Sequence, residues 1–134
     1  MYSLQTGDEG QVPIAAHGGG TLPASIGEAR DMARARLTGL DPERVEDCLL
    51  VVSELVTNAF RYGDGVAGFE VLPEPDGIRV SVGDHSSRLP TTPQPDGGFL
   101  PGGYGWRLVR RLARDIRVTL LARGGKVIQV VLPR

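Results

Sequence analysis

The most informative run in this sequence is Glu54-Leu55-Val56-Thr57-Asn58-Ala59-Phe60-Arg61-Tyr62-Gly63. It places a carboxylate, Glu54, and a carboxamide, Asn58, four residues apart. Side chains at i and i+4 lie one above the other on a helix, so these two share a face. The apolar residues have the i, i+3, i+4, i+7 spacing of a helix that buries one side: Val45, Cys48, Leu49, Val52, Val56 and Ala59. We therefore expect one helix face in a core and, about opposite it, a proton acceptor beside a neutral oxygen ligand.

A simpler interpretation is that Glu54 and Asn58 only solvate an exposed helix face, as charged and amide side chains usually do. Two observations count against it. Leu50, Val51 and Leu55 flank the pair, so this side of the helix is not uniformly polar. Asparagine is also a weak helix former that is usually found at helix ends, yet Asn58 stands within the helical pattern. A chemical role for the pair would explain its position.

The composition favours a single soluble domain. At 134 residues the chain has the size of one domain and can bury a core without disulfides or metals. Its 15 basic and 16 acidic residues nearly cancel, which gives no electrostatic case for nucleic acid or an anionic membrane. The single cysteine, Cys48, falls on the apolar stripe and is expected to be a buried hydrophobe. The sequence contains no membrane-length apolar run and no signal-peptide pattern, so we expect a cytoplasmic protein.

The N-terminal part of the chain is expected to lie outside the main domain. Residues 1–10 read as a polar, poorly ordered terminus. Residues 11–16 have the pattern of a short edge strand, and the glycines at 18–20 end it. We therefore divide the chain into a flexible N-terminus with this edge strand, residues 1–21, and one domain, residues 22–134.

Two helices are predicted next. Ser25, followed three residues later by Glu28, forms a capping box and predicts a helix start, and Gly39 is expected to end this helix. The pair Asp41-Pro42 is typical of the N-cap and first position of a helix. This second helix carries Glu54 and Asn58 and is expected to stop at Gly63.

The remainder of the chain alternates between strand and helix signals. Residues 66–72 and 78–82 are expected to form a hairpin, and residues 116–121 and 126–132 a second one. Between the hairpins, residues 104–114 have a helical pattern. The order of helices, hairpin, helix, hairpin predicts an α+β, two-layer sandwich in which helices cover one face of a mostly antiparallel sheet.

Two features between the hairpins indicate a site. Asp84 follows a predicted strand directly, where its carboxylate is either an acceptor for an exocyclic amine such as that of adenine or an ordinary turn residue. Residues 85–103 contain four prolines and four glycines and read as a functional loop such as a lid. The loop ends in Gly102-Gly103-Tyr104-Gly105, directly before a helix start that offers N–H groups to phosphate. This is neither a Walker A motif nor a dinucleotide fingerprint.

The three signals together are more specific than any one alone. The chain resembles the histidine-kinase-like ATPases, because it has their three motifs in the same order. These are a Glu-x-x-x-Asn helix, an aspartate at the end of a hairpin strand, and a glycine-rich turn before a later helix. The histidine-kinase-like ATPases form the GHKL superfamily, with the Bergerat ATP-binding fold. Within it the chain is most similar to the anti-sigma-factor serine kinases. The resemblance covers about residues 22–132, and residues 54–63 are its most specific part.

The resemblance implies a role for each matching residue. Asn58 would bind Mg²⁺, which bridges the nucleotide phosphates, because a neutral oxygen ligand suits that hard cation. Glu54 would act as general base toward the hydroxyl of a partner serine. Asp84 would hold the adenine amino group. Phosphate contacts are implied for Gly103 and Gly105 and, unless it is only an exposed surface residue, for Arg61.

The sequence departs from the family pattern at three places. Tyr62 stands where many relatives have histidine. After Asp84 the chain reads His85-Ser86-Ser87 in place of the family's familiar glycine. Trp106 replaces a smaller aliphatic residue, and with Tyr104 it either caps a nucleotide or crowds it out.

Two functions therefore compete. The resemblance implies a kinase that uses Mg²⁺ and ATP to phosphorylate a serine of an anti-anti-sigma (STAS-type) partner and so regulates transcription by partner switching. The alternative is a catalytically weak binding module that sequesters a sigma factor or another regulator. Relatives often form homodimers. The basic residues of the third predicted helix are expected to be a solvated face rather than a site for direct nucleic-acid binding: Arg107, Arg110, Arg111 and Arg114.

Overall fold

The computed structural model describes residues 2–7, 21–89 and 103–134. These residues form three helices and a five-stranded sheet with the strand order β1-β4-β5-β3-β2. Along the chain the elements are β1 (Ser3–Gly7), α1 (Ile26–Arg36), α2 (Pro42–Tyr62), β2 (Val66–Glu74), β3 (Gly77–Asp84), α3 (Gly103–Leu112), β4 (Asp115–Leu121) and β5 (Lys126–Pro133).

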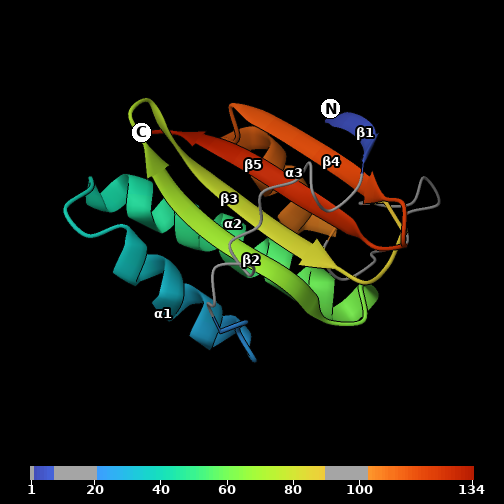
Figure 1. Ribbon diagram of the computed structural model, residues 1–134. Coiled ribbons are helices and arrows are strands. Elements are labelled where there is room, and N and C mark those ends of the chain that lie inside the picture. Colours follow the sequence, from blue (N-terminus) through green and yellow to red (C-terminus); the bar gives the residue numbers. More distant parts are fainter. Residues whose placement is uncertain (1, 8–20, 90–102) are drawn as a thin grey trace.

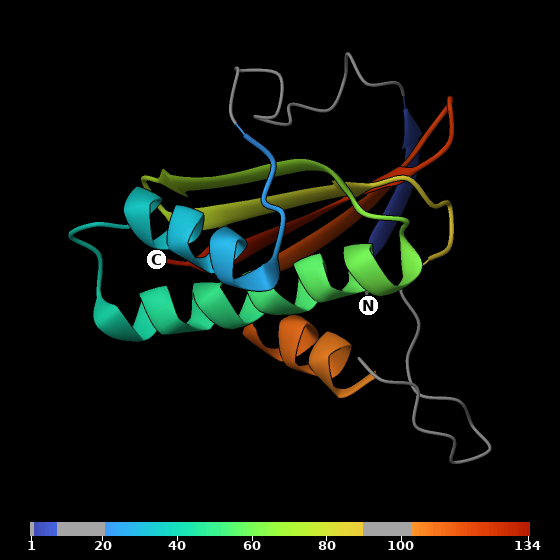
Figure 2. The same ribbon diagram turned by 90° about the horizontal axis from the view of Figure 1, so that it is seen from below.

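The helices and the sheet form two layers. The pairs β2–β3, β3–β5 and β4–β5 are antiparallel, whereas β1 runs parallel to β4. The three helices lie on one face of the sheet (Figure 1), and in Figure 2 the sheet runs above α2 while α3 lies beneath it. This architecture confirms the α+β sandwich with a mostly antiparallel sheet. Within the helical layer, α2 contacts both α1 and α3.

The predicted starts of α1 and α2 and the predicted stop of α2 are confirmed. The Ser25 side chain accepts a hydrogen bond from the Glu28 backbone N–H (3.0 Å), and that of Asp41 accepts one from the Glu43 N–H (3.0 Å). Both bonds satisfy N–H groups that a helix start leaves without a partner. At the other end of α2, Gly63 donates to the carbonyl of Ala59 (3.0 Å). Helix α1 ends at Arg36, slightly before the predicted stop.

The core lies between α2 and the sheet. The buried stripe of α2 is broader than predicted, because Val51 and Leu55 are as buried as the expected positions, while Val45 is only partly buried. Leu50 is 42% exposed. Cys48 is buried, and burial raises the pKa of its thiol to about 12. Its burial confirms that Cys48 belongs to the core, and a buried thiol with a raised pKa is a poor nucleophile.

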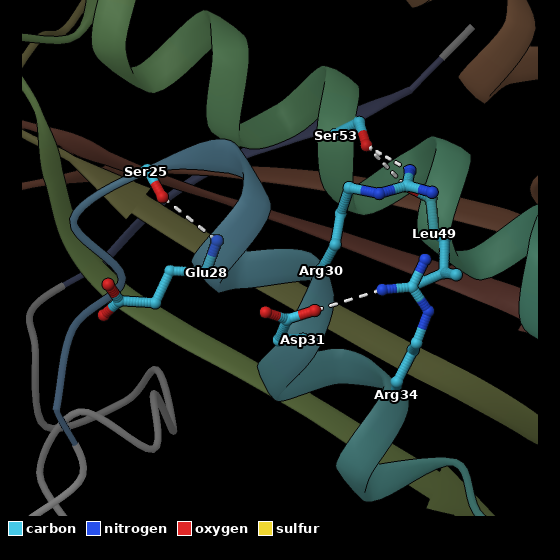
Figure 3. Close-up of polar contacts among 7 residues, drawn as sticks. All are labelled: Ser25, Glu28, Arg30, Asp31, Arg34, Leu49 and Ser53. Atoms are coloured by element: carbon cyan, nitrogen blue, oxygen red, sulfur yellow. Dashed lines mark hydrogen bonds and ion pairs between the residues drawn. The ribbon is translucent and has the colours of Figure 1, made fainter.

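Helix α1 is fastened to α2 next to the site. Arg30 donates to the Ser53 hydroxyl (2.8 Å) and to the carbonyl of Leu49 (3.3 Å), as Figure 3 shows. Ser53 in turn donates to the same carbonyl (2.8 Å). The same view shows the Ser25 cap and the exposed pair of Arg34 and Asp31. Since Ser53 directly precedes Glu54, this network fixes the turn of α2 from which Glu54 projects.

The N-terminal prediction was wrong for residues 3–7. These residues form β1, which pairs in parallel with β4 at the edge of the sheet. Two side-chain contacts hold the segment: Gln5 donates to the Thr119 hydroxyl (3.0 Å), and the Tyr2 ring packs edge-to-face on that of Trp106 at 5.8 Å. The edge strand predicted at residues 11–16 lies outside the described residues.

Candidate functional site

Glu54 occupies the side of α2 that faces α3. Its side chain is half-buried, because the first turn of α3 packs against it at Gly105. A Cβ built on Gly105 would overlap the Glu54 carboxylate, so the close approach of the two helices depends on the absence of a side chain at this position. The predicted helix start at residue 104 is also shifted: Gly103 and Gly105 lie inside the first turn of α3 rather than before it.

The pKa of the Glu54 carboxyl is raised above its ordinary value. Burial is the main cause, because it disfavours the charged form, and the positive charge of Arg61 partly opposes the rise. Arg61 lies two turns further along α2 on the same side and is exposed. A carboxylate with a raised pKa is a better proton acceptor than an ordinary surface carboxylate, provided that it remains ionised.

Asn58 lies one helical turn from Glu54 and is also only half-buried. Within residues 2–7, 21–89 and 103–134, no hydrogen bond engages its carboxamide. Its oxygen is therefore a donor atom of the type that Mg²⁺ accepts, on the same helix face as the proton acceptor. No group of three or more His, Cys, Asp or Glu side chains among the described residues is arranged to hold a metal alone. A cation here would need further ligands from a bound phosphate.

Asp84, the last residue of β3, lies against the C-terminal end of α2. Alternate residues of β3 point to the helix side of the sheet, and Asp84 continues the series of Ile78, Val80 and Val82 on that side. Its side chain is only 5% exposed. Gly63, the C-cap of α2, packs against it so closely that a Cβ there would lie 2.5 Å from the Asp84 Cγ. His85 N–H also donates to the Gly63 carbonyl (2.8 Å), so β3 and the end of α2 are joined at this point.

A residue that the sequence interpretation missed, Lys126, is bound to Asp84. Its Nζ donates to Asp84 Oδ2 at 2.7 Å, and the two side chains are 6% and 5% exposed. The backbone N–H of Ser86 donates to Asp84 Oδ1 (2.9 Å). Burial raises the pKa of the Asp84 carboxyl, while Lys126 and the Ser86 N–H oppose that rise. Lys126 is placed by the register of β5 against β3, which no local sequence signal reveals.

The structure distinguishes between the two aromatic residues near the glycines. Trp106 is only 2% exposed, belongs to the core and contacts Tyr2, so its ring is not available to cap a nucleotide. The side chain of Tyr104 and most of the expected lid, residues 90–102, lie outside the described residues. Of the segment after Asp84, Arg88 is placed with its guanidinium over the Tyr62 ring, 6.0 Å from the ring centroid.

The predicted site residues lie either on α2 or against it. Glu54 meets α3 at Gly105, Asn58 follows one turn later, and Gly63 brings the C-terminal end of α2 onto Asp84. From Glu54 to Gly63 the helix rises by about 14 Å, at 1.5 Å per residue. The arrangement separates a half-buried proton acceptor and an oxygen ligand at one end from a buried hydrogen-bond acceptor at the other. Such an elongated site suits a ligand with a phosphate end and a base end.

Comparison with known proteins agrees with this reading. A family model described as a histidine kinase-like ATPase domain matches residues 21–132. The chain therefore belongs to the histidine kinase-like ATPase family, a class of ATP-binding domains. The matched region contains α2, β3 and α3. A comparison with curated proteins gave no match. Among the described residues, no helix has the length and apolar character needed to cross a membrane.

Proposed function

We propose that this protein is a cytoplasmic serine/threonine protein kinase of the anti-sigma-factor type. It transfers the terminal phosphoryl group of ATP to a serine of an anti-anti-sigma (STAS-type) partner and regulates transcription by partner switching. The observation that carries the proposal is the position of Glu54. A half-buried carboxylate with a raised pKa shares a helix face with a carboxamide that has no hydrogen-bond partner among the described residues, in an ATP-binding fold.

Each residue of the site has a role in this proposal. Glu54 accepts the proton of the partner serine hydroxyl as that oxygen attacks the terminal phosphorus, and ADP leaves with the bridging oxygen. Asn58 and the nucleotide phosphates would hold Mg²⁺, which would neutralise phosphate charge. Asp84 accepts a hydrogen bond from the base. The first turn of α3, with Gly103 and Gly105, offers backbone N–H groups to phosphate, and Arg61 adds positive charge.

Glu54→Gln tests the catalytic part of this proposal. The amide has almost the same shape as the carboxyl but cannot accept the serine proton, so phosphoryl transfer to the partner should fall by about 10²–10⁴-fold. The affinity for ATP, measured by calorimetry, should change little because Glu54 contacts the reacting hydroxyl. Glu46→Gln is the matched control, since Glu46 is exposed on the same helix two turns earlier. Unimpaired transfer by Glu54→Gln would contradict the role of Glu54.

One observation favours a second function, a binding module that sequesters a sigma factor or another regulator. The carboxylate proposed to contact the base is already bonded to Lys126, at 2.7 Å. In that case nucleotide would be a structural ligand or absent, and Glu54→Gln would leave partner capture unchanged. A transfer assay with the partner and labelled ATP separates the two, because only the kinase produces a phosphorylated serine. Homodimerisation, which the resemblance implies, is compatible with either function.

A further inference from the structure

The ion pair of Lys126 and Asp84 is unusual for this chain. Lys126 is the only lysine in the sequence, in which every other basic residue is arginine or histidine. It lies directly opposite Asp84 in the β3–β5 register, and both side chains point to the helix side of the sheet. Buried charges of this kind are costly unless paired. A neutral pair would fill the same space, so the charges call for an explanation beyond packing.

The backbone holds Lys126 in place. The turn between β4 and β5 contains Gly124 and Gly125, whose φ angles are +93° and +88°. Residues with a side chain rarely adopt such positive φ angles. A Cβ at Gly125 would lie 2.5 Å from the carbonyl oxygen of Asp84. The turn therefore packs directly against the end of β3, so that Lys126, the next residue, lies beside the Asp84 carboxylate. Lys126 also reaches the carbonyl of Ser86 at 3.4 Å.

The ammonium group changes what Asp84 offers to a ligand. An ionised carboxylate only accepts hydrogen bonds, so alone it would bind the 6-amino group of adenine and repel the 6-oxo group of guanine. Here the Ser86 N–H occupies Oδ1, and an ammonium with three donors lies on Oδ2. The 6-amino group of adenine would therefore have to donate to Oδ2 alongside the ammonium group of Lys126. A 6-oxo group, in contrast, finds a donor where the carboxylate alone would offer none.

We propose that Lys126 determines the base selectivity of the site and lets it accept 6-oxopurine nucleotides, such as GTP, as well as ATP. The inference rests on the proposed function in one respect, namely that Asp84 contacts the base. In the wild-type protein the ammonium of Lys126 donates to the 6-oxo group while Asp84 accepts from the ring N–H beside it. Without Lys126, the 6-oxo group faces a carboxylate only, and adenine is selected.

The test compares the dissociation constants of ATP and GTP by calorimetry in the wild type and in Lys126→Met. In the wild type the two constants should lie within about tenfold of each other, and in Lys126→Met the ratio should shift toward ATP by at least about tenfold. Arg79→Met is the matched control, because it also removes a cation from a pair on this sheet, with Glu74 at 3.2 Å, away from the base site. Its ratio should equal that of the wild type.

A second measurement does not depend on the variant's folding. Because the chain has one lysine, lysine labelled with ¹³C at Cε gives a single side-chain signal in the wild type. Both nucleotides should shift this signal. A wild type that binds ATP but rejects GTP, a ratio unchanged in folded Lys126→Met, or a signal that ATP moves and GTP does not would each overturn the inference while leaving ATP binding intact. A wild type that binds neither nucleotide would overturn the proposed function as well.

Discussion

Two opposing effects act on the pKa of the Glu54 carboxyl, and a single substitution can separate them. Burial against α3 raises this pKa, and the charge of Arg61 lowers it. Because the pKa in the folded protein exceeds that in the unfolded chain, the protonated form contributes stability. That contribution is complete below the unfolded-state pKa and is lost as the pH rises through the folded-state pKa. The ionised form that catalysis needs is therefore the less stable one.

The substitution Arg61→Gln removes the charge that lowers this pKa. The pKa of Glu54 should then rise further, and the acid limb of the pH–rate profile for phosphoryl transfer should move to higher pH. Arg34→Gln provides the control, since Arg34 is an exposed arginine of α1 that is paired with Asp31 and is not among the charges that shift the pKa of Glu54. An acid limb that stays in place, or that moves to lower pH, would show that Glu54 is not the group that titrates.

At the level of elements, the contact of α2 with α3 depends on one glycine. Gly105→Ala places a methyl group on the Glu54 carboxylate, so either the carboxylate or α3 must move. We expect a loss of about 1–3 kcal/mol in the free energy of unfolding, as for overpacked sites, together with a fall in phosphoryl transfer. Denaturant unfolding and the transfer assay measure the two effects.

Gly27→Ala is the matched control for Gly105→Ala, because Gly27 also lies in the first turn of a helix. The nearest atom to its added Cβ is Ser25 Oγ at 4.0 Å. Alanine there should stabilise the protein by about 0.5–1 kcal/mol through its greater helix propensity. Equal stability changes in the two variants would mean that the Glu54 contact imposes no constraint on Gly105.

The sequence allowed the elements with local signals to be predicted. Caps such as Ser25 and Asp41 marked both helix starts, and apolar alternation marked the hairpins. Strand β1 was missed because Ser3–Gly7 has no apolar alternation and is almost wholly exposed; its pairing with β4 joins residues more than a hundred positions apart. Lys126 was missed for a related reason, since only the strand register brings it to Asp84.

For the site, the residue types could be predicted but not their surroundings. The i, i+4 spacing placed Glu54 and Asn58 on one face of α2. That α3 would half-bury this face, and that Gly105 would meet the carboxylate, depends on helix packing. The same holds for Trp106, whose place in the core follows from its contact with Tyr2. Local pattern therefore identifies candidate groups, while tertiary packing sets their pKa values and partners.

In the whole molecule, the candidate site is elongated and runs along α2. One end of the helix meets α3 at Gly105, and the other is joined to β3 through Gly63 and Asp84. Both junctions rely on glycine, because a side chain at either position would collide with a carboxylate. A ligand that occupied the site from end to end would contact both layers of the sandwich, and its binding should stabilise the folded protein.

The most direct test of this account is a calorimetric titration of the wild-type protein with ATP, in Mg²⁺ and again with Mg²⁺ removed by a chelator. The account predicts saturable one-site binding that weakens markedly when Mg²⁺ is removed, because Asn58 and the phosphates then lose the cation they share. Asn58→Ala should bind ATP with little dependence on Mg²⁺. A folded wild-type protein that takes up no ATP in either condition would contradict the central claim that the face of α2 carrying Glu54 and Asn58 is a nucleotide site.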